Sequence, residues 1–165
     1  MPSEIREPAY PVPGDLDDER FRWLFDYWRA RHRDGKLPGR EHIDPLDFPQ
    51  LLGRLYLVEV VREGGRLRFW FRLWGSRIRG IFGHDHTGHW LEEIAAPGTL
   101  ADIEAALSAC TLEARPFFWR RPMMVESAEY AATRRLVLPL AADGKTVDML
   151  LGLIIEDWRE LPSQM

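Results

Sequence analysis

Arg66-Leu-Arg-Phe-Trp-Phe-Arg-Leu-Trp74 is the stretch that decides the fold, because its side chains alternate in character with the period of a β-strand. One face of this strand has no polar member and is expected to point into the core. That face consists of Leu67, Phe69, Phe71 and Leu73. The opposite face mixes arginines with Trp70 and Trp74, which need a cover that the helix predicted at residues 17–34 can supply.

The strand has partners on both sides of it in the sequence. Residues 54–62 are rich in Leu, Tyr and Val, and Gly64-Gly65 predicts a hairpin between the two strands. After Pro116 the pattern returns to strands over 117–125, 128–140 and 146–157, with a turn at Asp143-Gly144. Runs of strands split by one helical block predict an α+β fold, with an antiparallel sheet covered on one face by helices.

Helical spacing is clearest in residues 17–34, and Gly35 ends the pattern. The apolar stripe of this helix consists of Phe21, Leu24, Phe25 and Trp28. Trp23 and Tyr27 lie four residues apart on a displaced face, which indicates either a dimer or partner surface or a helix covered on two sides by its own domain. Shorter helices are expected at 45–52 and 76–83, and a longer one at 99–114 carries Cys110 on its apolar stripe.

Composition sets the class of protein. A chain of 165 residues with 45% hydrophobic residues indicates one globular domain over residues 15–160, with a flexible leader at 1–14 and a tail at 161–165. A net charge of -4 argues against nucleic acid or an anionic membrane surface as partner, and the basic pairs Arg120-Arg121 and Arg134-Arg135 are interpreted as solvated. A single cysteine and the absence of a signal peptide or spanning segment predict a cytoplasmic protein.

Three segments in order resemble a bacterial family of stand-alone PAS-type domains. They are Leu37-Pro-Gly-Arg-Glu-His-Ile-Asp-Pro45, Phe71-Arg-Leu-Trp-Gly-Ser76 and Gly83-His-Asp-His-Thr-Gly88, and the likeness covers roughly residues 20–155. The resemblance implies a five-stranded antiparallel sheet in the order 2-1-5-4-3, with helices on one face around a possible cavity and an extra N-terminal helix. Members of the PAS fold bind haem, flavin, metabolites or only other proteins, so the resemblance does not name a ligand.

A cavity in such a fold would be lined by apolar residues of the strands and of the 76–83 helix. The candidate pocket residues are Phe69, Phe71, Leu73, Ile78, Phe82, Trp90, Phe118, Met124, Leu136 and Met149. The polar or amphipathic residues expected at its mouth are Arg72, Trp74 and Arg77.

The sequence offers little for chemistry. His84, His86 and His89 are the weak candidates for a metal site, but Thr87-Gly88 indicates a turn in which the side chains need not converge. No nucleophile elbow or phosphate loop is present, and Cys110 does not lie in the setting of a photoactive flavin domain. We therefore expect no catalytic residues, no metal and no defined cofactor.

The leading hypothesis is a non-enzymatic sensory module that binds a small molecule or a protein partner and acts through homodimerisation or docking. One alternative is a pure interaction adaptor with a solid core. The other is a metal-assisted hydrolase that uses the histidines between His84 and His89.

Overall fold

The computed structural model describes residues 16–95, 98–124 and 129–160, with side chains described outside 122–124, 129–131 and 158–160. A five-stranded antiparallel sheet runs through it in the order β2-β1-β5-β4-β3, as predicted. The strands are β1 (Leu55–Glu63), β2 (Arg66–Trp74), β3 (Phe117–Met124), β4 (Glu129–Leu140) and β5 (Met149–Glu160). The predicted leader and tail lie outside the described residues.

Both predicted tight turns are present. Gly64 and Gly65 adopt positive φ values of 58° and 78°, which suit the two-residue hairpin between β1 and β2. Between β4 and β5, the Asp143 carboxylate accepts hydrogen bonds from the backbone N–H groups of Lys145 and Thr146, at 2.8 and 2.7 Å. The side chain thus satisfies donors that the turn would otherwise leave unpaired.

The N-terminal helix is shorter than predicted. α1 (Glu19–Ala30) begins at Asp18, whose side chain accepts a hydrogen bond from the Arg20 N–H, and ends before the chain folds back through a bridge between Arg33 and Lys36. Short 3₁₀ turns follow as η2 (Arg40–His42), η3 (Pro45–Asp47) and η4 (Pro49–Arg54), because the prolines interrupt regular helix.

Three further helices lie between β2 and β3: α2 (Ser76–Phe82), α3 (Leu91–Ile94) and α4 (Leu100–Glu113). The sequence predicted α2 and α4 but not α3, which is a single turn. Among the described residues, no helix has the length and apolar character that a membrane span requires.

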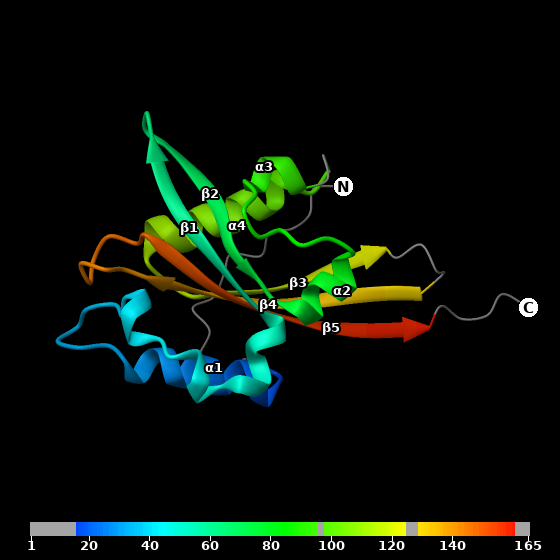
Figure 1. Ribbon diagram of the computed structural model, residues 1–165, viewed down its shortest axis with the longest axis horizontal. Coiled ribbons are helices and arrows are strands. Elements are labelled where there is room, and N and C mark those ends of the chain that lie inside the picture. Colours follow the sequence, from blue (N-terminus) through cyan, green and yellow to red (C-terminus); the bar gives the residue numbers. More distant parts are fainter. Residues whose placement is uncertain (1–15, 96–97, 125–128, 161–165) are drawn as a thin grey trace, which may run out of the picture.

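The sheet is covered on both faces (Figure 1). α1 and the 3₁₀ turns pack on one face, where Phe21, Phe25 and Trp28 join the leucines of β1, β4 and β5 in one core cluster. α2, α3 and α4 pack on the other face, where a second cluster includes Phe71 and the buried Cys110. The expectation that the N-terminal helix covers Trp70 and Trp74 is therefore wrong, because Trp74 belongs to the second cluster and Trp70 packs edge-on against Trp90.

A β-bulge explains why the predicted alternation in β2 does not hold at the end of the strand. Leu57 is paired with Leu73, but Val58 is paired with Phe71, so that Arg72 is an extra residue in the strand. A shift of one residue exchanges the two faces beyond it. Leu73 is consequently 42% exposed, and Trp74 is turned into the core at 7% exposure.

The Tyr56 ring packs closely against the backbone of Gly152 in the neighbouring strand. The two residues are directly paired across β1 and β5, and a Cβ added at Gly152 would lie 2.0 Å from Cζ of the Tyr56 ring. The ring therefore lies flat over the glycine, in the space that any other residue would occupy.

Gly152→Ala should lower the free energy of unfolding by about 2–3 kcal/mol, because the buried Tyr56 ring has to move out of a packed core. Urea denaturation followed by tryptophan fluorescence measures this change. Gly80→Ala is the matched control: Gly80 is in α2 with nothing within 4 Å of an added Cβ, so alanine should be neutral or stabilising by up to about 1 kcal/mol. Equal stability of the Gly152→Ala and wild-type proteins would contradict the close contact.

Candidate functional site

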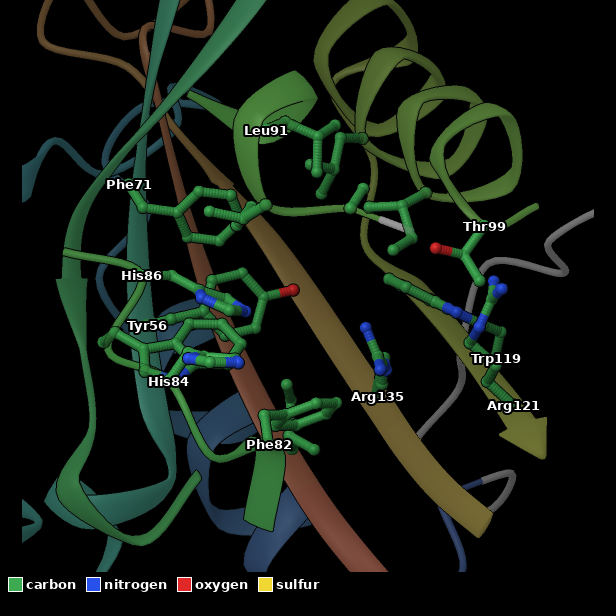
Figure 2. Close-up of a pocket in the computed structure, with 16 residues that line it drawn as sticks. Tyr56, Phe71, Phe82, His84, His86, Leu91, Thr99, Trp119, Arg121 and Arg135 are labelled. Carbon is green, nitrogen blue, oxygen red and sulfur yellow. The ribbon is translucent and has the colours of Figure 1, made fainter. Parts of the chain in front are cut away.

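A cavity of about 370 Å³ lies between the sheet and the helices α2 to α4 (Figure 2). Its volume is in the range of small-molecule sites. Residues from β1 to β5, from α2, α3 and α4 and from the loop after α2 form its wall. They are Tyr56, Phe71, Trp74, Phe82, His84, His86, Leu91, Ile94, Ala95, Thr99, Ile103, Leu107, Trp119, Arg121, Arg135 and Ile154.

Arg135 is the most unusual member of this wall because it is a charged side chain only 7% exposed. Its Nε donates a hydrogen bond to the Thr133 hydroxyl at 3.1 Å, and its guanidinium carbon lies 5.4 Å from the centre of the Phe82 ring. Among the described side chains no carboxylate forms an ion pair with it. The interpretation of Arg134-Arg135 as solvated is wrong. Successive side chains of a strand point to opposite faces of the sheet, and because both faces of this sheet are covered, each arginine points into a packed layer.

Burial lowers the pKa of Arg135 to about 10, which still leaves the guanidinium protonated at neutral pH. Burial raises the pKa of the Tyr56 hydroxyl, which is therefore neutral in the same range. Figure 2 shows this hydroxyl and the Arg135 guanidinium directed into the same space. The cavity thus holds a cation and a neutral hydroxyl group above the middle of the sheet.

Arg121 also lines the cavity, but its charge has a partner. Its Nη1 lies 3.6 Å from Oδ2 of Asp102 at the start of α4. Arg135 is accordingly the guanidinium of the wall whose charge no described carboxylate offsets.

The loop between α2 and α3 is held on β2 by backbone hydrogen bonds. Phe71 donates to the His89 carbonyl at 2.9 Å and accepts from the Gly88 N–H at 2.7 Å. The Thr87 hydroxyl accepts a hydrogen bond from the Trp74 N–H at 3.0 Å. These bonds place the His86 ring against the Trp74 ring, with 4.2 Å between the ring centres.

His86 sits in an apolar setting, and its Nδ1 is buried without a hydrogen-bond partner among the described residues. Burial, together with the neighbouring His84, lowers the pKa of His86 to about 4. The ring is therefore neutral at physiological pH and acts as part of the aromatic wall.

The three histidines do not converge on one point. His89 contacts Glu93 at 3.2 Å, and the Asp85 carboxylate between them accepts a hydrogen bond from the Thr87 N–H at 3.0 Å. Within the part of the chain that the structure describes, no group of three or more His, Cys, Asp or Glu side chains is placed to hold a metal ion.

Of the predicted pocket residues, Phe71 and Phe82 line the cavity. Trp74, predicted at the mouth, is part of the wall itself. Phe69 and Ile78 are buried in the same core cluster without lining the cavity. Trp90 packs edge-on against Trp70 at 4.9 Å.

The structure places the other predicted pocket residues away from the cavity, where it describes them. Phe118, Leu136 and Met149 pack in the cluster under α1, and Leu73 is exposed by the bulge. Because β4 and β5 are apolar on both faces, their sequences do not show which residues face which helices. The side chain of Met124 lies outside the described residues.

The predicted mouth residues Arg72 and Arg77 are on the surface. Arg72 forms an ion pair with Glu59 at 3.3 Å, and Arg77 forms one with Glu156 at 2.9 Å. Neither lines the cavity.

Sequence reasoning missed Tyr56, Trp119, Arg135 and the apolar residues of α3 and α4. One signal was available for Arg135: consecutive arginines within a long apolar strand must point to opposite faces, so one of them has to enter each layer. Nothing comparable marked Tyr56, whose position depends on Gly152, a residue of the adjacent strand that is far away in the sequence.

The family model described as PAS domain matches residues 17–155 of the chain. Among solved structures, the chain is similar to the PAS domain of a protein from Colwellia psychrerythraea, with 12% identity and a TM-score of 0.46, over 73% of this chain and 100% of that one. It is also similar to a sensory box histidine kinase/response regulator from Burkholderia thailandensis, with 14% identity and a TM-score of 0.41, over 68% of this chain and 84% of that one. A search of curated proteins finds no match.

His86→Phe should reduce the loss of stability on acidification. The pKa of His86 is lower in the folded protein than its ordinary value of 6.5, so the unfolded chain binds the extra proton first and stability falls as pH drops from about 6.5 toward 4. The measurement is the unfolding free energy of each protein at pH 7 and at pH 4.5. The change between the two pH values is then compared between variant and wild type, so that the contributions of the other titrating groups cancel. A parallel loss in the variant and the wild type would show that His86 is not buried against Trp74.

Proposed function

Because this chain belongs to the PAS domain family, we propose that it is a non-enzymatic sensory module that binds a small molecule in the cavity and signals by changing its association with a second copy of the chain. The observation that supports ligand binding is the cavity of about 370 Å³ with the charged side chain of Arg135 inside it. A buried cation without an opposite charge lowers the stability of the folded domain, so we do not expect one in a core that serves packing alone.

Two neighbouring arginines supply a route from the cavity to the far side of the sheet. Arg135 faces the cavity, while Arg134 points to the opposite face and lies 2.8 Å from Asp17 and 3.6 Å from Asp18. Asp18 is the residue that caps α1. A ligand that moves Arg135 along β4 would therefore act on the first turn of α1 through Arg134.

α1 carries the surface that we assign to association with a second copy of the chain. Trp23 is 38% exposed on this helix, a large apolar side chain that the domain itself leaves partly uncovered. Tyr27 is fixed by hydrogen bonds within its own domain. Its hydroxyl donates to the Asp47 carboxylate at 2.7 Å and accepts from the Asp44 N–H at 2.9 Å. Trp23 is thus the contact residue, and Tyr27 orders the helix beside it.

The two alternative functions have less support. A pure adaptor would not need a cavity lined by a cation and a hydroxyl group. A metal-assisted hydrolase would need converging ligands, whereas His86 packs on Trp74 and His89 pairs with Glu93 among the described residues.

Filling the cavity should abolish ligand binding without unfolding the domain. Ile103→Trp places a larger side chain of α4 into the cavity, whereas Leu112→Trp puts the same side chain on the outer face of α4, at a position 72% exposed. Native mass spectrometry of the full chain should show a retained small molecule in the wild type and in Leu112→Trp, and none in Ile103→Trp. A bare wild-type chain, with no compound in an organic extract, would contradict the proposed function.

Trp23→Lys should weaken self-association by at least about tenfold, since a charge replaces an apolar contact. Light scattering coupled to size exclusion, over a range of protein concentrations, measures the dimer fraction. Glu19→Lys on the same helix is the control for added charge alone. A wild-type protein that stays monomeric at all concentrations would rule out the dimer.

A further inference from the structure

We propose that the ligand of this cavity is a small organic carboxylate with an apolar or aromatic body, and that the Arg135 guanidinium binds its carboxylate group. The inference rests on the proposed function, since it names the chemical class of the ligand for the same cavity. It is drawn from the charge, the geometry and the apolar wall of the site.

The charge of the cavity is the first reason. Arg135 is buried and cationic, and its described polar contact is with the neutral Thr133 hydroxyl at 3.1 Å. An ion in an apolar interior is costly until an opposite charge joins it, and the cost of desolvating it has already been met during folding. An anion that enters the cavity therefore gains an interaction that a neutral compound does not.

The other charged groups near the cavity do not alter this balance. Arg121 is neutralised by Asp102 at 3.6 Å, and the low pKa of His86 keeps that ring uncharged at neutral pH. Among the charged side chains of the wall and the described residues around it, both facts leave one uncompensated positive charge, which matches a ligand with a single negative charge.

The geometry of the donors favours a carboxylate over a phosphate. A guanidinium offers a planar fork of N–H groups that fits the two oxygens of a carboxylate. The Tyr56 hydroxyl, directed into the same space, supplies one more donor (Figure 2). A phosphate monoester carries about −1.5 to −2 charges at pH 7, more than one arginine offsets.

The remainder of the wall sets the body of the ligand. Leu91, Ile94, Ile103 and Leu107 form the side of α3 and α4, and Phe71, Trp74 and Trp119 form the side of the sheet. Such a surface accepts aliphatic chains and aromatic rings and offers little to a sugar or a nucleotide.

The test compares pairs of compounds that differ in charge and share a body. 3-Phenylpropionate and octanoate are titrated into the full-length protein beside 3-phenylpropionamide and octanamide, with phenyl phosphate as the test for a phosphate ligand. Trp74 and Trp119 in the wall report binding by fluorescence, and calorimetry gives the affinity. Each carboxylate should bind at least about tenfold more tightly than its amide, which is the effect of a charge-assisted hydrogen bond.

Two variants assign the effect to Arg135. Arg135→Met keeps a long side chain and removes the charge, and it should lose at least about tenfold in affinity for the carboxylates and little for the amides. Arg120→Met, an exposed arginine on the neighbouring strand, should bind all probes as the wild type does. Amides that bind as well as carboxylates, or phenyl phosphate that binds better, would overturn the assignment and leave ligand binding intact.

Failure of both charged and neutral probes, with a wild-type chain that retains no compound in native mass spectrometry, would overturn this inference together with the proposed function. If the chain retains a compound, the identity of that compound decides: a carboxylic acid supports the inference, and any other class overturns it.

A second measurement needs no ligand. In probe-free protein, Arg135→Met should leave Tm unchanged or raise it, because an apolar side chain replaces a buried ion without an opposite charge. A fall in Tm of more than about 4 °C would show that Arg135 is already paired within the fold, and would overturn the inference.

Discussion

Burial of the sheet on both faces is the constraint on which the rest of this structure depends. α1 with the 3₁₀ turns covers one face, and α2 to α4 cover the other. Each of the central strands must therefore place apolar side chains alternately into two separate cores. A polar side chain in such a strand cannot reach water by turning to the other face, so it has to find its partners inside the protein.

Arg134 and Arg135 are both subject to this constraint. Their positions in β4 send one guanidinium under α1, where Asp17 and Asp18 neutralise it, and the other into the cavity. Arg135 is buried, whereas Arg134 is half-buried, so the two charges differ in depth as well as in surroundings. Arg134 holds the first turn of α1 through Asp17 and Asp18, and Arg135 has no ion-pair partner among the described carboxylates.

Two local departures from regular structure shape the cavity between the sheet and the second helical layer. The bulge at Arg72 turns Trp74 inward, where its ring meets His86 at 4.2 Å. The absence of a side chain at Gly152 lets the Tyr56 ring lie flat on the neighbouring strand. Without the bulge, Trp74 would point away from this layer. With a larger residue at position 152, the Tyr56 ring would have to move out of its place over the neighbouring strand.

The sequence by itself determined the strands, their turns, the positions of α1, α2 and α4, and, through the resemblance, the order of the strands. These features are local, because the alternation of residues 66–74, the glycines at 64 and 65 and the spacing in α1 each depend on neighbours in the chain. Only the tertiary structure decided which residues line the cavity. In strands that are apolar on both faces, the sequence does not indicate which layer each side chain enters. The effect of a bulge or a glycine depends on a partner strand that is far away in the sequence. Leu136 and Arg135 differ by one position, and the pairing of β4 with β3 and β5 sends them into different cores.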